Sequence, residues 1–458
     1  MFGETIAAIS TAPGEAGIGI VRISGPKALD ILDTLFKPKR RKSIREYSPR
    51  KMVYGFILEG DERIDEVLAV YMKGPGTYTA EDIAEIDCHG GLVPSRKILE
   101  MVLKNGARAA ERGEFTKRAF LNGRLDLAQA EAVMDLIGAK TDKSYDIALD
   151  QLEGGLSLKV KSIRNELLSL LAGIEVAIDY PEEDIEEISY EGILEHGQAA
   201  KNAISDLLET ADTGKIMRQG LQTVIIGKPN VGKSSLLNAL LQEARAIVTN
   251  VPGTTRDIIE EHLNVRGIPL KIVDTAGIRE TEDMIEKMGV EKSKAFFNKA
   301  DLVILVLDAG DALKDEDREM MEYVKARKAI VLINKTDLEV KIDEKEIREL
   351  MGDKAIIRTS VLKGSGLKEL EDKIVDMVYS GEVFKRGDAL VTSARQKNAL
   401  ERALISINEA IETTKKKMPY DFIEIDIKNS YAYLGEIIGE TVGDDIIDKV
   451  FSDFCLGK

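Results

Sequence analysis

Residues 227–234 read Gly-Lys-Pro-Asn-Val-Gly-Lys-Ser, and their types and spacing suit the binding of a phosphate chain. Gly227 and Gly232 permit backbone angles that a side chain would forbid, so several backbone N–H groups can converge on one phosphate. Lys233 supplies positive charge to the β- and γ-phosphates of a nucleotide, and the Ser234 hydroxyl is a ligand for Mg²⁺.

The elements on either side of this octet are those that a P-loop needs. A β-prone run over 221–226 precedes it, and a helical pattern follows from Leu236. A strand, a glycine-rich turn and a helix whose N-terminus faces the anion make up the phosphate-binding unit. The predicted phosphate-binding residues are Asn230, Val231, Gly232, Lys233, Ser234 and Ser235.

A second motif, at 274–277, follows the β-prone run that ends at Val273. Asp274 can reach the Mg²⁺ coordination sphere, and the N–H of Gly277 can contact a γ-phosphate. The predicted nucleotide-binding residues of this motif are Asp274, Thr275, Ala276 and Gly277.

Two further motifs select the base. In Asn334-Lys335-Thr336-Asp337, the Asp337 carboxylate offers two oxygens to the N1–H and N2–H₂ of guanine. Adenine would leave this carboxylate unpaired, and hydrogen-bond selection of this kind discriminates on the order of 10⁴-fold. Ser360 and Val361 follow another strand and can offer a backbone N–H to the guanine O6. Together with the P-loop, these motifs predict a guanine-nucleotide site whose base is held by Asn334, Lys335, Asp337, Ser360 and Val361.

The segment 249–257 lies where a first switch loop belongs. A threonine hydroxyl there can join Mg²⁺ while the γ-phosphate is present, and the sequence does not choose between Thr254 and Thr255. The nucleotide-binding residues expected in this loop are Thr249, Asn250, Val251, Pro252, Gly253, Thr254 and Thr255.

The position directly after Gly277, where Ras-like proteins carry a water-orienting glutamine, is Ile278. An isoleucine cannot orient water, so another group must do so. Arg256 is either an internal arginine finger or an exposed switch arginine. The other candidates lie in the polar stretch that follows: Arg279, Glu280, Glu282 and Glu286.

Length and composition predict a soluble, cytoplasmic, multidomain protein. The 458 residues exceed one ordinary core, and no apolar run approaches the roughly 18 residues of a membrane span. Cys88 and Cys455 are the two cysteines, which suits a reducing compartment. The formal net charge of −16 argues against broad, nonspecific binding to a phosphate backbone, while it leaves room for a local basic face.

The first third of the chain predicts an α+β domain. Short β-prone runs include 18–24 and a hairpin formed by 53–58 and 66–72, and a helix fits 94–104. Glycines near Gly19 resemble a dinucleotide motif, but the sequence continues as a strand, so we reject that reading. Cys88 and His89 point to opposite faces of a strand, and we interpret Cys88 as structural.

Helical patterns surround the nucleotide motifs on both sides. They begin near Thr116 and include 163–178, a helix over 193–208 that ends near Gly214, and 394–416, 421–438 and 444–454. Between them, strands at 224–226, 270–273, 302–307, 329–333 and 355–359 alternate with helices, which predicts a parallel sheet covered on both faces. We therefore predict an α+β domain at 1–118, a helical domain at 119–215 and 381–458, and an inserted doubly wound α/β domain at 216–380.

Several longer stretches resemble the MnmE (TrmE) family of tRNA-modification GTPases over essentially the whole chain. They are I-V-R-I-S-G at 20–25, T-Y-T-A-E-D at 77–82, C-H-G-G at 88–91, R-G-E-F-T-K-R-A-F-L-N-G-R-L-D-L at 112–127, G-T-T-R-D at 253–257 and F-C-L-G-K at 454–458. The resemblance implies a tetrahydrofolate-binding N-terminal domain that also dimerises, a helical domain, and an inserted Ras-like GTPase (G) domain.

The resemblance also implies roles for individual residues. It places 5-formyl- or methylene-tetrahydrofolate on four residues: Arg22, Glu85, Arg124 and Lys458. It assigns K⁺ to Asn230, Thr249, Val251 and Thr254, and Mg²⁺ to Ser234 and Thr255. Glu286 matches the family's water-activating glutamate. Cys455 matches a cysteine suspected of a role in modification, and a small buried residue is the alternative.

By the same resemblance, the chain is a potassium-dependent GTPase activated when two G domains dimerise. It works as a homodimer with the FAD-dependent partner MnmG (GidA) and adds an aminomethyl-type group to carbon 5 of the wobble uridine of certain tRNAs. The alternative is a ribosome-assembly or signalling GTPase that acts purely as a binding switch. A simple folate-dependent one-carbon transferase is disfavoured by the intact GTPase motifs.

Overall fold

The computed structural model describes residues 3–179, 189–243, 261–272, 300–379 and 389–458. It divides into two compact units, one made of Met1–Met134 with Tyr431–Lys458 and the other of Asp135–Ser430. Each unit is described by itself.

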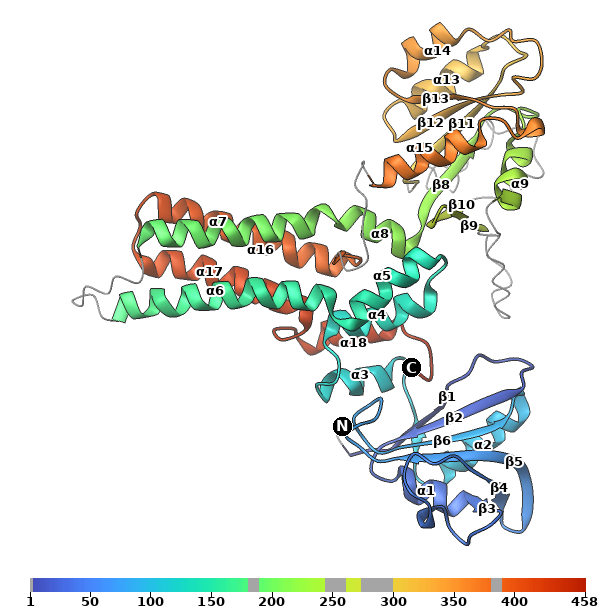
Figure 1. Cartoon of the computed structure of the whole chain (residues 1–458), viewed down its shortest axis with the longest axis vertical. Coiled ribbons are helices and arrows are strands. Elements are labelled where there is room, and N and C mark those ends of the chain that lie inside the picture. The colour runs from blue at the N-terminus through green and yellow to red at the C-terminus, as the bar shows by residue number, and fades with distance from the viewer. Residues whose placement is uncertain (1–2, 180–188, 244–260, 273–299, 380–388) are drawn as a thin grey trace. The chain divides into compact units, whose positions relative to one another are not determined.

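The first unit is built on a seven-stranded sheet with the order β3-β4-β5-β6-β2-β1-β7 (Figure 1). Neighbouring strands are antiparallel, except that β1 and β7 are parallel. The strands are β1 (Ile6–Ile9), β2 (Ile18–Ser24), β3 (Phe36–Pro38), β4 (Val53–Glu59), β5 (Glu62–Met72), β6 (Ile83–His89) and β7 (Arg108–Ala109).

Helices α1 (Ala28–Leu35) and α2 (Leu92–Lys104) bury their apolar sides in the core of this sheet. A 3-10 helix η1 (Ile44–Glu46) lies between β3 and β4. Residues from both ends of the chain meet here, because the Phe451 ring of α18 (Asp444–Ser452) lies 6.3 Å from the Phe120 ring of α3 (Glu114–Leu121).

The second unit contains a six-stranded sheet with the order β13-β12-β11-β8-β10-β9. All neighbours are parallel except the edge pair of β10 and β9. The strands are β8 (Leu221–Ile226), β9 (Glu261–Val265), β10 (Ile268–Ile272), β11 (Leu302–Asp308), β12 (Ala329–Asn334) and β13 (Ala355–Arg358).

Helices cover both faces of this sheet, which explains the nearly continuous apolar character of its central strands. Alternate residues of β8 enter different cores: Ile225 packs with α9 (Lys233–Glu243) and α15 (Leu367–Tyr379), whereas Val224 packs with α13 (Asp315–Val324) and α14 (Glu344–Met351). A short 3-10 helix, η2 (Val361–Lys363), follows β13. The fold is the predicted doubly wound α/β domain.

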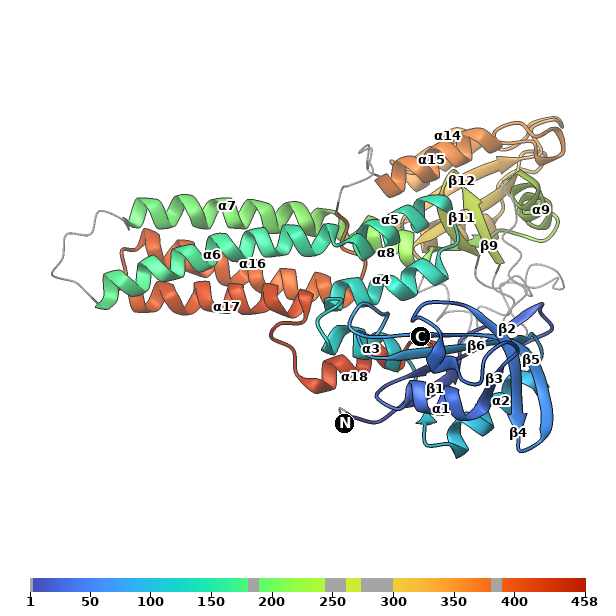
Figure 2. The ribbon, with the colours of Figure 1, turned by 60° about the horizontal axis from the view of Figure 1, so that its bottom comes forward.

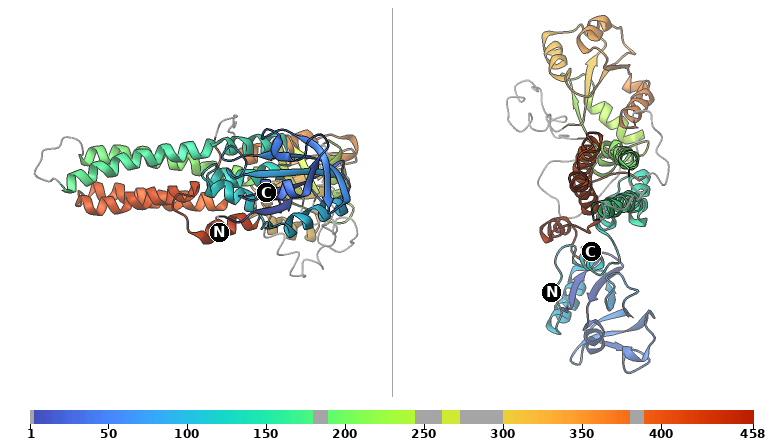
Figure 3. Two further views of the ribbon diagram at one scale, coloured as in Figure 1. Left: turned by 90° about the horizontal axis from the view of Figure 1, so that it is seen from below. Right: turned by 90° about the vertical axis from the view of Figure 1, so that its left-hand side faces the viewer.

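The rest of the second unit is helical. The helices of this part, which lie wholly or in part in the second unit, are α4 (Leu127–Gly138), α5 (Asp142–Glu153), α6 (Gly155–Asp179), α7 (Tyr190–Glu209), α8 (Ala211–Gln219), α16 (Ala394–Lys415) and α17 (Tyr420–Ile438). Figures 1 and 2 show the long helices α6, α7, α16 and α17 side by side, and the same green and red helices lie together in both views of Figure 3. Ser430 Oγ donates to Ala403 O at 3.0 Å and so ties two of them together.

The predicted fold class and the order of its elements are confirmed, with one detail wrong. The helix predicted over 193–208 corresponds to α7, which ends at Glu209, but Gly214, expected near its end, lies inside the next helix, α8. The glycine is needed for close packing, since a Cβ there would lie 2.2 Å from Val391 O. The three domain boundaries stay predictions. Among the described residues, no helix has both the length and the apolar character to cross a membrane.

Candidate functional site: a guanine-nucleotide cradle and an N-terminal cationic cluster

The P-loop connects β8 to α9, and its two glycines lie where a side chain cannot fit. A Cβ on Gly227 would lie 2.3 Å from Val306 O, and one on Gly232 would lie 2.3 Å from Asn334 Nδ2. Both glycines also have positive φ, as does Asn230 between them. The loop therefore folds against two neighbouring strands with its backbone facing the start of α9, as an anion site requires.

Lys233, the first residue of α9, folds back over this loop. Its Nζ donates to Gly227 O at 2.7 Å and to Lys228 O at 2.6 Å. Burial lowers the pKa of Lys233, and no carboxylate among the described residues lies within ion-pair distance of it. A phosphate group would supply the negative charge that this half-buried ammonium needs, so the residues present fit a nucleoside triphosphate.

The P-loop is also tied to α13 by a buried ion pair that the sequence reasoning missed. Lys228 Nζ donates to Asp317 Oδ2 at 2.5 Å, and these side chains are 13% and 5% exposed. The same Asp317 oxygen accepts the Lys314 N–H at 3.0 Å, next to the start of the helix. The only signal in the sequence was a lysine at the second position of the octet.

The guanine motifs meet at one buried side chain. Asn334, at the end of β12, donates from Nδ2 to Val231 O at 2.9 Å. Its Oδ1 accepts the Val361 N–H at 3.2 Å and the Thr359 hydroxyl at 3.3 Å. Asn334, itself part of the N-K-x-D motif, thus links the P-loop to the second base-recognition segment at 359–361. Lys335 is oriented separately, because its Nζ lies 2.6 Å from Asp308 Oδ2.

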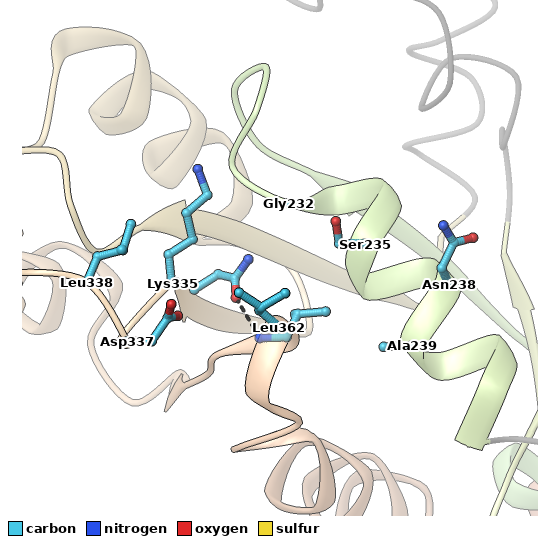
Figure 4. A pocket seen from close by; sticks show the side chains of 10 residues that line it. Gly232, Ser235, Asn238, Ala239, Lys335, Asp337, Leu338 and Leu362 are labelled. Carbon is cyan, nitrogen blue, oxygen red and sulfur yellow. Dashed lines mark hydrogen bonds between the residues drawn. The ribbon is translucent and has the colours of Figure 1, made fainter.

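Asp337 is held ready to accept hydrogen bonds. The Ser360 hydroxyl donates to its Oδ1 at 2.5 Å, and this bond is the main cause of a lowered pKa for Asp337. The side chain borders a cavity of about 510 Å³, and Figure 4 shows Lys335, Asp337 and Leu338 on one side, with Ser235 and Asn238 of α9 opposite. The residues that line it are Gly232, Ser235, Asn238, Ala239, Asn334, Lys335, Asp337, Leu338, Val361 and Leu362.

The structure therefore brings together the predicted phosphate and base residues of the P-loop, 334–337 and 360–361. Ser234 and Asn230, which carry the predicted Mg²⁺ and K⁺ roles, are exposed at this loop. A hydroxyl suits Mg²⁺ and an amide carbonyl suits K⁺, so these two donors fit the ions by their chemistry. The other predicted residues lie outside the described part of the chain: Thr249, Asn250, Val251, Pro252, Gly253, Thr254, Thr255, Arg256, Asp274, Thr275, Ala276, Gly277, Ile278, Arg279, Glu280, Glu282 and Glu286.

A second constellation lies in the first unit, where Arg22 of β2 and Glu85 of β6 are directly opposite each other. Arg22 Nε donates to Glu85 Oε1 at 2.7 Å. The Tyr78 ring joins them to Arg124, because the Arg22 and Arg124 guanidinium carbons lie 5.7 Å and 4.8 Å from its centroid. Arg124 also donates to Tyr78 O at 3.2 Å.

Lys458 completes this group from the far end of the sequence. Its backbone O accepts the Phe115 N–H at 3.2 Å. Burial, followed by the nearby charge of Arg22, lowers the pKa of Lys458, while Cys455 and Glu85 act in the opposite direction. Cys455 is exposed, so the alternative of a small buried residue is wrong for it. We call Arg22, Tyr78, Glu85, Arg124 and Lys458 the N-terminal cationic cluster.

A largely buried network that links β7 to α3 supports this unit, and the sequence reasoning did not find it. Glu114 accepts two hydrogen bonds from Arg108 at 2.8 and 2.6 Å and a third from Arg118 at 3.0 Å. Burial alone would raise the pKa of Glu114, but the bonds from Arg108, the Glu111 N–H and Arg118 lower it to about 2. Arg118 continues the network to Glu81 at 3.0 Å.

Cys88 is buried and donates to Gly19 O at 3.2 Å, and burial raises the pKa of its thiol. This supports the structural interpretation of Cys88. His89 instead bonds Asp65, with Nδ1 and Oδ1 2.7 Å apart. Among the described residues, no group of three or more His, Cys, Asp and Glu side chains is arranged to hold a metal ion.

A P-loop, an N-K-x-D loop and a doubly wound sheet inserted between helices define a multidomain P-loop GTPase. The sequence matches two family descriptions, "GTP-binding protein TrmE N-terminus" over residues 5–124 and "MnmE helical domain" over residues 127–455. The chain belongs to the MnmE family, and it is a GTPase.

Three curated relatives carry the name tRNA modification GTPase MnmE. The protein of Alkaliphilus metalliredigens is 60% identical over 457 residues, and that of Clostridioides difficile is 54% identical over 455 residues; each match covers 99% of both chains. The Bacillus subtilis protein is 49% identical over 458 residues, 99% of this chain and 100% of the relative. The solved G domain of the T. maritima FeoB iron transporter is 30% identical and covers 34% of this chain and 97% of that chain, with a TM-score of 0.26. The family membership rests on the full-length relatives.

Proposed function

We propose that this GTPase is the GTP-hydrolysing component of a tRNA-modifying complex. In this proposal it adds an aminomethyl-type group to carbon 5 of the wobble uridine of certain tRNAs, together with an FAD-dependent partner, MnmG. The observation that carries the proposal is that this chain holds both a guanine-nucleotide cradle and a cationic cluster. Its relatives over nearly the full length are named for tRNA modification, which supports the proposal.

The residues of the cradle have distinct tasks in GTP binding. The P-loop N–H groups and Lys233 hold the phosphates, and Asp337, fixed by Ser360, pairs with the guanine edge. Ser234 and Thr255 would hold Mg²⁺, and Asn230, with Thr249, Val251 and Thr254, would hold K⁺. These cations supply positive charge where negative charge develops during phosphoryl transfer.

We assign activation of the attacking water to Glu286, because Ile278 cannot orient it. GTP hydrolysis should then be much faster in K⁺ than in Na⁺, and Glu286→Ala should bind GTP but barely hydrolyse it. Equal rates in the two salts would contradict the Asn230 assignment, and normal turnover of Glu286→Ala would contradict the catalytic role.

The N-terminal cationic cluster is the proposed site for 5-formyl- or methylene-tetrahydrofolate, with Arg22, Glu85, Arg124 and Lys458 as its contacts. Its charge pattern supports this assignment, since a folate combines an amide-like heterocycle, which a carboxylate such as Glu85 can bind, with acidic groups that pair with cations. Cys455 is exposed and precedes Lys458 of this cluster by three positions in the sequence, and we propose that it takes part in the modification.

The proposal includes a homodimer in which two G domains meet across their nucleotides, and the domain limits 1–118, 119–215 with 381–458, and 216–380. The switch-only alternative lacks a reason for the folate-type cluster. Nucleoside mass spectrometry of tRNA from cells with and without the gene tests the choice. Loss of the modified wobble uridine is expected without the gene, and unchanged wobble uridines would refute the proposal.

A further inference from the structure

Residues 37–51, between β3 and β4, form the most basic stretch of an acidic chain. Its eight cationic side chains and the single carboxylate of Glu46 give a formal charge of +7, whereas the whole chain carries −16. All eight cationic residues are exposed. We call this stretch the basic segment, and its cations are Lys37, Lys39, Arg40, Arg41, Lys42, Arg45, Arg50 and Lys51.

Most of these charges are not neutralised inside the protein. Arg45 is the exception, because it bonds Asp33 at 2.9 Å and also pairs with Asp30. Arg41 donates to Glu46 O, and Arg50 donates to Gly76 O at 2.6 Å, so both meet neutral carbonyl groups. The remaining five form no ion pair with any described residue: Lys37, Lys39, Arg40, Lys42 and Lys51.

The basic segment is nevertheless anchored to the fold. Lys37 pairs with Phe56 in the β3–β4 ladder, and a capping box holds the 3-10 helix η1 within the segment. Two tyrosine rings make cation–π contacts with the segment. The Arg41 Cζ and Lys51 Nζ atoms lie 4.7 Å and 5.8 Å from the Tyr47 ring centroid, and the Lys39 Nζ atom lies 5.1 Å from the Tyr54 ring centroid. The charges are thus presented on a sheet edge rather than on a free tail.

A run of charged side chains on a protein surface is most often only solvated. The basic segment, however, brings together many positive charges that repel one another. A polyanion would remove that repulsion and gain from counterion release. Within residues 37–54, all of which the structure describes, Met52 and Tyr54 are the exposed large hydrophobic side chains, and the Tyr54 ring contacts Lys39 while its hydroxyl bonds Glu66. A membrane-binding surface inserts several apolar side chains, so lipid fits this segment less well than a nucleic acid.

We propose that the basic segment is a docking surface for the phosphate backbone of a folded RNA. This inference rests on the proposed function, in which tRNA is the substrate, and adds the surface that positions it. Contacts to phosphates fix the register and orientation of a nucleic acid without reading its bases. The segment therefore contributes affinity and placement, and the choice of uridine is made elsewhere.

The test is a charge reversal on the full chain, Lys39→Glu with Arg40→Glu and Lys42→Glu. A matched control reverses three consecutive exposed lysines at the end of α16, Lys415→Glu with Lys416→Glu and Lys417→Glu, and changes the net charge equally. Fluorescence anisotropy with an unmodified tRNA transcript is recorded from 50 to 200 mM salt. GTPase rate and thermal unfolding of each variant show whether it is folded, and Lys39→Gln with Arg40→Gln and Lys42→Gln replaces the reversal if that variant does not fold.

We expect the basic-segment variant to bind tRNA at least about tenfold more weakly at low salt, with the slope of log K against log salt reduced by roughly 2 to 3. The control should bind as the wild type does. Unchanged affinity and slope, or an equal loss in the control, would overturn the proposal. So would loss of binding to phosphatidylserine vesicles with unchanged tRNA binding, which would assign the segment to a membrane.

This outcome is separable from that of the proposed function. If the segment governs tRNA affinity but wobble uridines are unchanged without the gene, the RNA surface stands and the proposed function fails. If modification of the wobble uridine depends on the gene but tRNA affinity is unchanged in the basic-segment variant, the proposed function stands and the RNA surface fails.

Discussion

The nucleotide cradle offers a phosphate mainly backbone N–H groups, together with the Lys233 ammonium that folds back over the loop, whereas the N-terminal cationic cluster is built from side chains. In the cradle, Gly227 and Gly232 press the loop against Val306 O and Asn334, so that main-chain N–H groups form the site. In the cluster, Arg22 and Glu85 come from paired strands and Lys458 from the far end of the sequence. A backbone site is encoded in a contiguous motif, while a side-chain site depends on the tertiary fold that collects it.

The largest expected effect tests the side chain of the cradle that contacts the base, Asp337. Asp337→Asn puts an N–H donor against the N–H₂ of guanine, so GTP affinity should fall on the order of 10³- to 10⁴-fold. Xanthosine triphosphate, which has a carbonyl at that position, should regain binding. Competition against a fluorescent GDP measures both, and Leu338→Ala, at the edge of the same cavity, is the control. Comparable GTP affinity in Asp337→Asn would remove Asp337 from base recognition.

The second prediction concerns the network around Glu114. Glu114→Gln removes the carboxylate that the buried Arg118 shares with the partly exposed Arg108, and it should lower the free energy of unfolding of the N-terminal unit by about 3 kcal/mol at pH 7. Scanning calorimetry of the full chain should show one transition shifted, while nucleotide binding is unchanged. Glu4→Gln is a matched control, since Glu4 contacts the same Arg108 at 2.7 Å but is exposed, and it should have almost no effect.

The pH dependence of that difference follows from the pKa of Glu114, which is lowered to about 2 from an ordinary value of 4.5. A carboxyl group with a depressed pKa in the folded state stabilises it fully above the unfolded value and loses this contribution as the pH falls. The gap between wild type and Glu114→Gln should therefore be constant above pH 4.5 and close as the pH approaches 2. A gap that persists at the lowest pH would show that packing, rather than ionisation, is responsible.

The same contrast explains how far sequence reasoning could reach. The P-loop, N-K-x-D and the alternation of strands and helices are local patterns, so they predicted the doubly wound fold of the G domain, and the structure brings residues of these two motifs together. Arg22, Glu85, Arg124 and Lys458 are far apart in sequence, and only the family resemblance proposed them as one set. The roles of Tyr78, which joins two of them, and of Glu114, which bonds Arg108 and Arg118, followed from no pattern, because they depend on strand register and burial. The break between α7 and α8 was missed because Gly214 serves packing rather than helix termination.

The third prediction tests how much the Lys228–Asp317 ion pair contributes to the nucleotide affinity of the P-loop. Lys228→Met removes the buried partner of Asp317 and should weaken GDP and a GTP analogue alike by about tenfold, because the first turn of the P-loop loses its tie to α13. Lys228→Arg should restore most of the affinity. KM should rise with kcat nearly unchanged, which a general loss of stability would not produce.

Arg318→Met is the control for this prediction. Arg318 lies on the same helix beside Asp317 and bonds Glu346 at 2.7 Å, away from the P-loop. The double variant Lys228→Met with Asp317→Asn should bind GDP no more weakly than Lys228→Met alone, because it also removes the buried carboxylate that Lys228→Met leaves unpaired. Wild-type affinity in a folded Lys228→Met would show that the glycines and Asn334 suffice to order the loop.

The smallest effect is expected for a conservative substitution in the cluster, Arg124→Lys. Arg124→Lys keeps the positive charge but gives up the planar contact with the Tyr78 ring and the directed bond to Tyr78 O. Tetrahydrofolate binding, followed by calorimetric titration, should weaken by only about two- to fivefold, in line with a cation–π contact at a partly exposed site. Arg124→Ala, which also removes the charge, should weaken it further. If Arg124→Lys were as damaging as Arg124→Ala, the geometry of the guanidinium would outweigh its charge, and the cluster would be as exacting about shape as the cradle is. If neither variant changed folate binding, Arg124 would serve only to orient Tyr78, and the cation that meets the ligand would have to be Arg22 or Lys458.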